Sequence, residues 1–374
     1  MEFSVVIPTH NRSSSLRRVL AAYEAQQPRD LTFEVVAVDD GSGDGTAEVL
    51  AGWRPRRYRL RFAVEPAGGP ARARNRALEL AAGRRVLFTG DDIEPAPDLL
   101  HQHLLGHQQY QDPGVAILGF IGWPEGSRPT ATMRHVDGPG AQQFSYYYFA
   151  DGAEYDFRHL YTSNVSVSRR LLDREPSYFS TDFPAAAFED AEFGYRLARR
   201  GLRIFYRAAA RASHHHRYEA AGFFHRQVRC GEMAALFYRK SPELERFLDL
   251  ATLENRRLVL LTHPGGVPEC ESLHLPLAEA ERRMLHLAGF FDPLPFDVDE
   301  LLGPLFRYAY LRGFAASFYP PATAERLCAR LFADILFPAL ERFAPRLRQE
   351  SIPYPQADLD TLCPRQGDIL RNRR

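Results

Sequence analysis

The segment Arg85-Val86-Leu87-Phe88-Thr89-Gly90-Asp91-Asp92 joins a short apolar run to two adjacent carboxylates. The apolar run has the length and composition of a buried β-strand. Two carboxylates at the end of such a strand are costly to desolvate when no basic neighbour neutralises them. A divalent cation that shares the site lowers that cost, and Mg²⁺ and Mn²⁺ prefer oxygen ligands and often hold substrate phosphates. The segment therefore predicts a cation site that handles a phosphorylated ligand.

Strand-like and helix-like segments alternate through the first half of the chain. The expected strands cover residues 3–7, 33–38, 60–64, 86–89 and 115–121, and the expected helices cover residues 13–26, 45–53 and 70–82. Continuous apolar strands separated by helices indicate a mainly parallel, Rossmann-like sheet with helices on both faces. The sequence therefore predicts an α/β fold.

Polar clusters follow three of the expected strands, at Thr9–Arg12, Asp39–Ser42 and Gly90–Asp92. In open parallel sheets, ligands bind beyond the carboxyl ends of the strands. All three clusters fall at such ends, so we expect them to converge on one site.

The second half of the chain has a different pattern. Strands are expected at Tyr146–Phe149, Tyr161–Val167 and Arg203–Tyr206, and a helix is expected from Glu189 to Arg200. The triplet His214-His215-His216 follows. From residue 241 onward the spacing is helical, with helices expected over residues 275–291, 298–318 and 323–347.

Composition indicates an ordinary globular protein of 374 residues with a formal net charge of zero. A neutral chain gives no electrostatic reason to expect a nucleic-acid partner. The four cysteines are widely spaced and fit no metal or disulfide pattern, so we expect reduced thiols. The sequence has no signal-peptide pattern and no apolar run of the roughly 20 residues needed to cross a bilayer. These features favour a cytoplasmic protein, with peripheral contact at the inner membrane face left open.

Five short segments then occur in a distinctive order. They are Val5-Val6-Ile7-Pro8-Thr9-His10-Asn11-Arg12, Val38-Asp39-Asp40-Gly41-Ser42, Ala73-Arg74-Asn75, Gly90-Asp91-Asp92 and Phe188-Glu189-Asp190. In this order they resemble a family 2 glycosyltransferase with the GT-A fold, over roughly residues 1–235. The stretch from Glu189 to Arg196 also resembles the acceptor-side motif of chondroitin-polymerase and galactosyltransferase relatives. The resemblance implies an inverting transferase, of the kind used in polysaccharide biosynthesis, that uses a nucleotide-diphosphate sugar.

The resemblance also implies residue roles. It assigns seven residues to the donor nucleotide: Pro8, Thr9, Arg12, Asp40, Arg74, Asn75 and Asp91. Asp40 would accept a hydrogen bond from the base imide, which weakly favours a UDP or dTDP sugar. The chain has Gly-Asp-Asp where many relatives have Asp-x-Asp, so the first carboxylate of that motif is absent.

The metal and the catalytic base are assigned in the same way. Asp92 and His214 would bind Mn²⁺ or Mg²⁺, and His216 is the rival ligand because the histidine triplet blurs the register. Asp190 would be the general base that deprotonates the acceptor hydroxyl. Glu189 would hold the acceptor, which is a glycan, a lipid-linked molecule or a small molecule.

The implied domains are residues 1–240, divided into a nucleotide-sugar half (1–122) and an acceptor half (123–240), and a helical C-terminal region (241–374). That region is open to three roles: capping the acceptor site, forming a homodimer or touching a membrane. Two other functions stay open, namely a non-catalytic sugar-binding protein and a sugar-1-phosphate nucleotidyltransferase. The second would require a Gly-rich basic loop directly after the first strand, where this chain has Pro8-Thr9-His10-Asn11.

Each motif also has a purely structural interpretation. Asp91 and Asp92 would then form a solvated turn after a strand. The cluster Asp39–Ser42 has residues that favour turns in any protein. Glu189 and Asp190 would cap a helix, where carboxylates interact favourably with the helix dipole.

Overall fold

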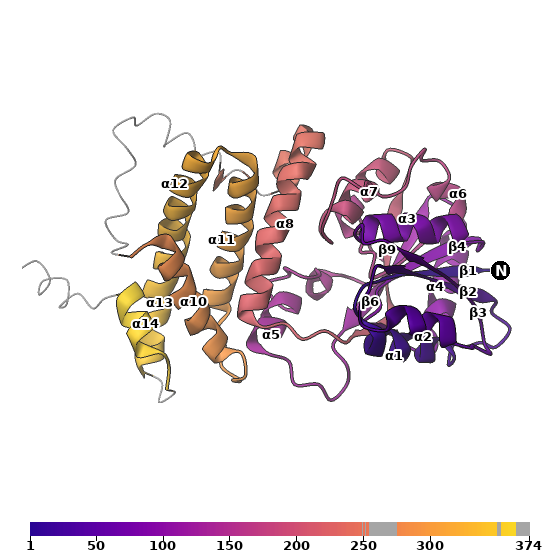
Figure 1. The fold of residues 1–374 in the computed structure, drawn as a ribbon, viewed down its shortest axis with the longest axis horizontal. Helices are drawn as coiled ribbons and strands as arrows, with labels where there is room; N and C mark the ends of the chain where they lie inside the picture. The colour runs from indigo at the N-terminus through magenta and orange to yellow at the C-terminus, as the bar shows by residue number, and fades with distance from the viewer. Residues whose placement is uncertain (249, 251, 254–274, 350–352, 364–374) are drawn as a thin grey trace, which may run out of the picture. The chain divides into compact units, whose positions relative to one another are not determined.

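The computed structural model (Figure 1) describes all residues except 249, 251, 254–274, 350–352 and 364–374. The chain forms two compact units. The first comprises Met1–Ser127 and Phe144–His216, and the second comprises Arg128–Gln143 and Arg217–Arg374. These units are defined by compactness, and the predicted functional division into residues 1–240 and 241–374 stays a prediction.

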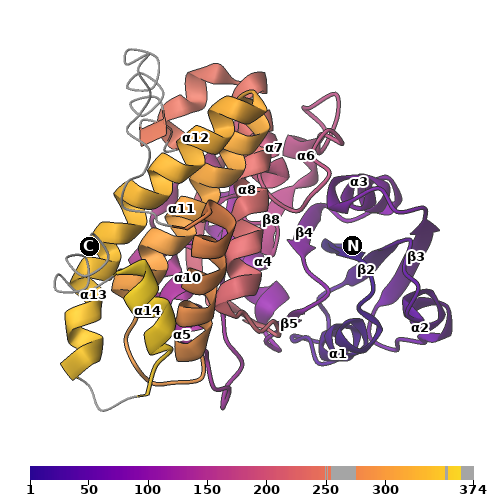
Figure 2. The same ribbon diagram turned by 60° about the vertical axis from the view of Figure 1, so that its left-hand side comes forward.

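The first unit is built on one mixed sheet of nine strands (Figures 1 and 2). In spatial order the strands are β3 (Arg59–Glu65), β2 (Phe33–Asp40), β1 (Phe3–Thr9), β4 (Arg85–Thr89), β8 (Asn164–Ser168), β6 (Val115–Gly122), β9 (Arg203–His214) and β5 (Ile93–Pro95), with the short β7 (Glu154–Tyr155) paired to β9. Strands β3, β2, β1 and β4 are parallel, and β8 runs antiparallel between β4 and β6. The predicted α/β class is confirmed.

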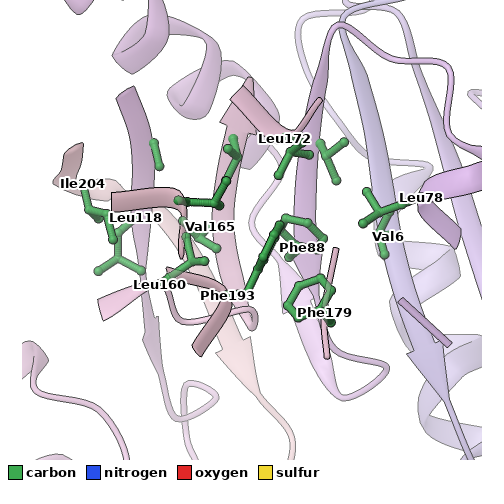
Figure 3. Close-up of a cluster of buried hydrophobic side chains, with 14 of the residues drawn as sticks. Val6, Leu78, Phe88, Leu118, Leu160, Val165, Leu172, Phe179, Phe193 and Ile204 are labelled. Atoms are coloured by element: carbon green, nitrogen blue, oxygen red, sulfur yellow. The ribbon is translucent and has the colours of Figure 1, made fainter. Parts of the chain in front are cut away.

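Helices cover both faces of this sheet, as the sequence predicts. One face carries α1 (Ser13–Tyr23), α2 (Thr46–Gly52) and α4 (Leu99–Tyr110), and the other carries α3 (Pro70–Leu80), α6 (Arg169–Leu172) and α7 (Glu189–Ala198). The alternation of side chains along β1 explains the two layers, because Val5 and Ile7 join the first core and Val6 joins the second. Figure 3 shows the second core, where Val6 lies near Leu78 of α3.

A buried hydrogen-bond chain ties α4 to strand β8. The Asn164 amide nitrogen donates to the carbonyl oxygens of Phe120 and Ala210, so its Oδ1 atom must accept from His103 Nε2, 2.9 Å away. His103 Nδ1 then accepts from the Ser166 hydroxyl, whose oxygen accepts from His107 Nε2. His103 thus has one donating and one accepting nitrogen and is neutral, and burial, which lowers the pKa of His107, favours the neutral form of that imidazole as well.

Three local predictions need correction. Residues Tyr146–Tyr148 form a 3₁₀ turn (η1) and not a strand, because Tyr146 is buried while Tyr147 and Tyr148 are exposed, which a strand's alternation would not give. Strand β8 begins at Asn164, three residues later than predicted. Strand β9 continues to His214 and so carries the start of the histidine triplet.

The second unit is helical. Its helices are α5 (Ala131–Asp137), α8 (Ala220–Lys240), α10 (Leu277–Phe291), α11 (Asp299–Phe318), α12 (Pro321–Leu331), α13 (Phe337–Gln349) and α14 (Gln356–Leu362), with a 3₁₀ turn η3 (Pro242–Phe247) after α8. The predicted helix over residues 323–347 is interrupted by one π-helical segment, Phe332–Leu336, labelled η4. None of the helices in the described ranges combines the length and apolarity required to cross a membrane.

Helices α8 and α11 approach each other through two glycines. A Cβ atom at Gly231 would lie 1.9 Å from the carbonyl oxygen of Tyr310. A Cβ atom at Gly313 would lie 1.9 Å from the carbonyl oxygen of Val228. The two helix backbones therefore lie so close together that only glycine fits at positions 231 and 313.

Asp292 holds the inserted helix α5 in the second unit. Its Oδ1 atom accepts from the Thr132 backbone N–H at 3.0 Å, and its Oδ2 atom accepts from the Ala220 N–H at 2.6 Å. Its own carbonyl accepts from the Ala131 N–H at 2.9 Å. Asp292, which directly follows α10, therefore fixes the first residues of both α5 and α8.

Candidate active site

The loops after β1 and β2 are joined by side-chain hydrogen bonds. His10 Nδ1 lies 2.8 Å from the Asp40 carbonyl oxygen, and Asn11 Oδ1 accepts from the Gly43 N–H. Asn11 has a φ of 53°, a left-handed conformation that asparagine tolerates better than most residues. Thr9 is buried, whereas Pro8 and Arg12 are half-buried at the rim. The predicted donor residues of the first loop therefore surround the ends of two neighbouring strands.

Asp40 organises the loop that follows β3. Its two carboxylate oxygens accept the backbone N–H groups of Gly68 and Gly69 at 2.7 and 2.8 Å. Gly69 has a φ of 86°, which a side chain would not tolerate easily. Each carboxylate oxygen keeps a second lone pair, so these bonds leave Asp40 able to accept another donor. Its predicted role at the base is neither tested nor excluded by this arrangement.

Asp91 and Asp92 differ in environment. Burial, and then the charge of Asp92, raise the pKa of Asp91 to about 6. Burial alone would raise the pKa of Asp92. The hydrogen bond and the charge interaction with His214 outweigh this effect, so the pKa of Asp92 is lowered. The Asp91 backbone carbonyl accepts from the Ser15 hydroxyl of α1, which fixes the turn.

Asp92 lies beside two histidines of the triplet. Its Oδ2 atom is 3.5 Å from His214 Nε2 and 3.7 Å from His216 Nδ1, and one ligand atom from each residue falls within 4.8 Å of the others. His215 instead pairs with Glu94, its Nε2 atom lying 2.6 Å from Oε2. The sequence left His214 and His216 as rivals, and the structure brings both to Asp92.

The pairing of β5 with β9 creates this cluster. Ile93 is opposite His214 in the antiparallel ladder, and the His215 N–H donates to the Asp92 carbonyl at 2.8 Å. One carboxylate oxygen and two imidazole nitrogens suit a divalent transition ion such as Mn²⁺, whereas Mg²⁺ prefers oxygen ligands throughout. The cluster therefore fits a divalent cation.

Arg74 and Asn75 contact the segment that leads into α7. Arg74 Nη1 lies 2.7 Å from Glu189 Oε1, and both side chains are almost fully buried. The Asn75 amide both donates to and accepts from the backbone of Phe179, at 2.8 and 2.9 Å. The structure thus joins Arg74, a predicted donor residue, to Glu189, the predicted acceptor residue, and joins Asn75 to Phe179 earlier in the same segment.

Asp190 follows Glu189 in the first turn of α7. Burial raises its pKa, the adjacent charge of Glu189 adds to that shift, and the Arg74 guanidinium opposes it. The carboxylate therefore holds a proton more readily than an ordinary aspartate. Such a shift is common for groups that transfer protons in active sites.

Aromatic side chains of the first unit lie beside the histidine cluster. The charge of Asp190 contributes to the raised pKa of Tyr161, about 12, which burial dominates. The Tyr161 ring lies 5.1 Å from the ring of Phe144, which lies 6.4 Å from the ring of His214. Trp123 stacks on His214 at 5.6 Å with an interplanar angle of 10°.

Sequence reasoning missed these aromatic residues. No spacing in the sequence relates Trp123 or Phe144 to His214. The only available signal was that Trp123 is one of two tryptophans and lies two residues after a predicted strand. Both rings lie beside the His214 ring.

The sheet order and the carboxylate–histidine cluster at its carboxyl edge define a GT-A-like transferase fold followed by a helical region. Residues 4–175 match the family described as "Glycosyl transferase family 2". These residues form a family 2 glycosyltransferase domain, and the resemblance seen in the sequence is confirmed.

Relatives of known name are similar to parts of the chain. Validoxylamine A glucosyltransferase of Streptomyces hygroscopicus subsp. limoneus is 29% identical over 222 residues, which cover 53% of this chain and 48% of that protein. Poly(ribitol-phosphate) beta-N-acetylglucosaminyltransferase TarS of Staphylococcus aureus is 36% identical over 93 residues, or 25% of this chain and 16% of that protein. The chain thus matches about half the length, or less, of these relatives.

Among solved structures, the mannosyltransferase PcManGT of Pyrobaculum calidifontis in complex with GDP-Man and Mn²⁺ is 20% identical, with a TM-score of 0.48. The match covers 98% of this chain and 88% of that one.

Proposed function

We propose that this chain is a metal-dependent inverting glycosyltransferase that moves a sugar from a nucleotide-diphosphate donor to a hydroxyl acceptor. One observation carries the proposal: Asp92, His214 and His216 each place a ligand atom within 4.8 Å of the others, in the same unit as the first turn of α7 that carries Asp190. Family membership supports sugar transfer as the reaction class.

Asp92, His214 and His216 would hold the divalent cation. When bound, the cation would supply positive charge near the departing diphosphate, which is the usual role of a metal in phosphate chemistry. The presence of two imidazoles favours Mn²⁺ over Mg²⁺.

Asp190 would take the proton of the acceptor hydroxyl. As the acceptor oxygen bonds to the anomeric carbon, the bond from that carbon to the diphosphate oxygen breaks, and the proton moves to a carboxylate oxygen of Asp190. A single displacement of this kind inverts the anomeric centre. The raised pKa of Asp190 makes its carboxylate a stronger base than an ordinary aspartate.

The donor pocket would be formed by the loops after β1 and β2. Thr9 and Arg12 lie at the strand ends, and the free lone pairs of Asp40 support its proposed bond to a uracil or thymine imide. Asp91 lies beside them at the end of β4 and would face the ribose or sugar. A UDP or dTDP sugar is the donor class that this arrangement favours.

A donor screen tests the proposal. Purified chain is incubated with UDP, dTDP and GDP sugars in Mn²⁺, in Mg²⁺ or with a chelator, and nucleotide-diphosphate release is measured. We expect release with at least one donor, stimulation by Mn²⁺ and loss with the chelator. The anomeric configuration of the product, read by NMR, should be inverted.

Three results would count against the proposal. Absence of release and of binding for every donor would remove the transferase assignment. Formation of a nucleotide sugar from a sugar 1-phosphate and a nucleoside triphosphate would favour the nucleotidyltransferase alternative. Full activity in the presence of the chelator would remove the metal.

A further inference from the structure

Arg74 and Asn75 both face the segment that leads into α7. Arg74 forms a buried ion pair with Glu189, the first residue of that helix. Asn75 forms two hydrogen bonds with the backbone of Phe179, which resemble the pairing between two strands. Both side chains therefore contact the same segment.

Phe179 anchors this segment in the core. Its ring lies 5.4 Å from Phe88 of β4 and 4.5 Å from Phe193 of α7, and Figure 3 shows the three rings together. The Arg74 guanidinium lies 5.5 Å from the same ring. Arg74 thus contacts both ends of the segment, at Phe179 and at Glu189.

The backbone changes direction just before Asp190. Phe188 has a φ of 64° and a ψ of −11°, a left-handed conformation that is rare for a bulky residue. Such strain persists only where the surrounding contacts impose it. The next residue, Glu189, forms the ion pair with Arg74, and this pair is one of the contacts that hold Phe188 in its conformation.

We propose that Arg74 and Asn75 are positioning residues that fix the first turn of α7, and with it Asp190, and do not contact the donor nucleotide. This inference rests on the proposed role of Asp190 as the base. It replaces the nucleotide-binding role that the sequence motif implies for both residues.

Charge gives the pair a second effect. Glu189 and Asp190 are adjacent carboxylates, and Arg74 is the cation that offsets their repulsion. Replacing Arg74 with an uncharged residue leaves the Glu189 charge buried without a partner. Asp190 then becomes harder to deprotonate, and the first turn of α7 loses an anchor.

The experiment compares Arg74→Met, Arg74→Lys and Asn75→Ala in the full chain. Arg76→Gln serves as the matched control, since Arg76 lies on the same helix and pairs with Glu65 and Glu79 away from α7. Three quantities are measured: the Kd for UDP with Mn²⁺, turnover across pH, and hydrogen exchange of the backbone amides of residues 188–192. Thermal melting shows whether each variant is folded.

For Arg74→Met we expect turnover to fall roughly 10- to 100-fold, with the UDP Kd close to wild type. The acid limb of the pH profile should move to higher pH, since the cation that lowers the Asp190 pKa is gone. Exchange at residues 188–192 should accelerate. Arg74→Lys should recover part of the turnover, Asn75→Ala should show faster exchange, and Arg76→Gln should resemble wild type.

A weakened UDP Kd with unchanged turnover would assign Arg74 to the nucleotide and overturn the inference. Unchanged exchange at residues 188–192 in a folded Arg74→Met chain would also overturn it. If the wild-type chain shows no activity with any donor, the proposed function fails, but the exchange measurement still reports on positioning. The two failures are therefore distinguishable.

A second inference comes from the edge of the sheet. Strand β3 is the last strand on its side and pairs only with β2 among the described strands, and Figure 2 shows it at the outer side of the first unit's sheet. Phe62 and Val64 are 42% and 53% exposed. With the half-buried Leu60 they form an apolar stripe on one face of the strand.

Next to this stripe, Trp53, Pro55 and Tyr58 line a shallow hollow of about 350 Å³. Natural proteins usually protect an open edge with charges, proline or a covering segment. Arg59, Arg61 and Glu65 are charged, but Phe62 and Val64 leave an apolar stretch exposed within the strand. The edge is therefore suited to pairing with another strand.

The sequence of β3 is self-complementary in one antiparallel register. When Phe62 faces Phe62 of a second copy, Leu60 faces Val64 and Arg59 faces Glu65. The apolar residues then share one face, and opposite charges meet at both ends. Glu65 also pairs with Arg76 of its own chain, at 3.1 Å, which leaves a second carboxylate oxygen for Arg59.

We infer that β3 pairs with β3 of a second copy of this chain, joining two sheets across the edge. This dimer is separate from one formed through residues 241–374 and does not depend on the enzymatic activity. Paired edges satisfy the outward backbone groups of both strands.

Sedimentation velocity of the full chain over a dilution series tests the dimer. The wild type should dissociate on dilution, and Phe62→Lys should be monomeric. Arg59→Glu and Glu65→Arg should each weaken dimerisation, whereas the double variant should restore it. Tyr147→Lys, a substitution at an exposed aromatic residue of η1, should not change the association.

A monomeric wild type at every concentration would end the inference. A dimer that is unaffected by Phe62→Lys would place the interface elsewhere. If the double variant does not dimerise better than the two single charge reversals, the proposed register is excluded.

Discussion

His214 Nε2 lies 3.5 Å from Asp92 Oδ2, because the short strand β5 pairs with the end of β9. His216 joins them, with its Nδ1 atom 3.7 Å from the same oxygen. The carboxylate follows strand β4 in the first half of the chain, and the imidazoles come from the last residues of the first unit. A cation there would tie the two parts of that unit together.

Removal of any of these ligands should weaken metal binding. For Asp92→Ala, His214→Ala and His216→Ala we expect Mn²⁺ affinity to fall at least about tenfold, measured by calorimetry. His215→Ala is the matched control, because His215 pairs with Glu94 and not with Asp92. Equal loss in the control would indicate a general disturbance of β9, and unchanged affinity in Asp92→Ala would remove Asp92 from the site.

Asp190→Asn should abolish transfer while the donor still binds. Loss of a general base lowers turnover by about 10²- to 10⁴-fold, and the isosteric amide keeps the shape of the helix start. Turnover and donor Kd are measured in parallel. Glu192→Gln, two residues further along α7 and paired with Arg196, should retain near wild-type turnover. Persistent transfer in Asp190→Asn would refute the base assignment.

Turnover should fall as pH decreases through a value above the ordinary range of aspartate. The base must be deprotonated, and burial together with Glu189 raises its pKa, so protonation begins at a higher pH than usual. The acid limb of a kcat profile reports this value. A profile that stays flat down to about pH 4, the range of an unperturbed carboxylate, would exclude Asp190 as the titrating group.

The buried imidazoles of α4 should make stability depend on pH. Burial lowers the pKa of His103 to about 4 and that of His107 to about 3, below the value of about 6.5 for an exposed histidine. The unfolded chain therefore takes up protons first as pH falls. The contribution of the two neutral imidazoles to the free energy of unfolding is therefore complete above about pH 6.5. It is lost as the pH falls towards the pKa values of the two histidines in the folded protein.

Thermal melting across this range provides the measurement. His107→Gln should reduce the pH dependence, because an amide can still donate to Ser166 but does not titrate. An identical pH dependence in that variant would show that other groups cause the acid sensitivity.

Gly231→Ala should destabilise the second unit. The added Cβ atom would collide with the Tyr310 carbonyl, and separating α8 from α11 to make room costs about 1–3 kcal/mol. Gly222→Ala is the matched control on the same helix, because a Cβ atom there has no neighbour within 4 Å. Denaturant unfolding measures both variants, and equal stability of the two would contradict the close contact.

Local patterns predicted much of the first unit. The apolar runs at Phe3–Thr9 and Arg85–Thr89 and the spacing of α3 are properties of short segments, so the sequence reveals them directly. The convergence of Asp40 and Asp92 on one edge follows from the topology of parallel sheets. These parts of the candidate site were therefore accessible without coordinates.

Contacts between distant segments were not accessible in this way. The Arg74–Glu189 ion pair and the stacking of Trp123 on His214 join residues that no spacing relates. Tyr146–Phe149 has the composition of a strand, but Tyr146 is buried and Phe149 packs against the core, whereas Tyr147 and Tyr148 are exposed.

The dependence of α5 on Asp292 has a consequence for how the protein is made. Residues 128–143 leave the ribosome long before the carboxylate that holds Thr132 and Ala220 has been synthesised. Since domains form largely in the order of translation, the first unit can assemble before this insertion has made its hydrogen bonds with Asp292. A chaperone that acts during synthesis would have its longest opportunity on that stretch.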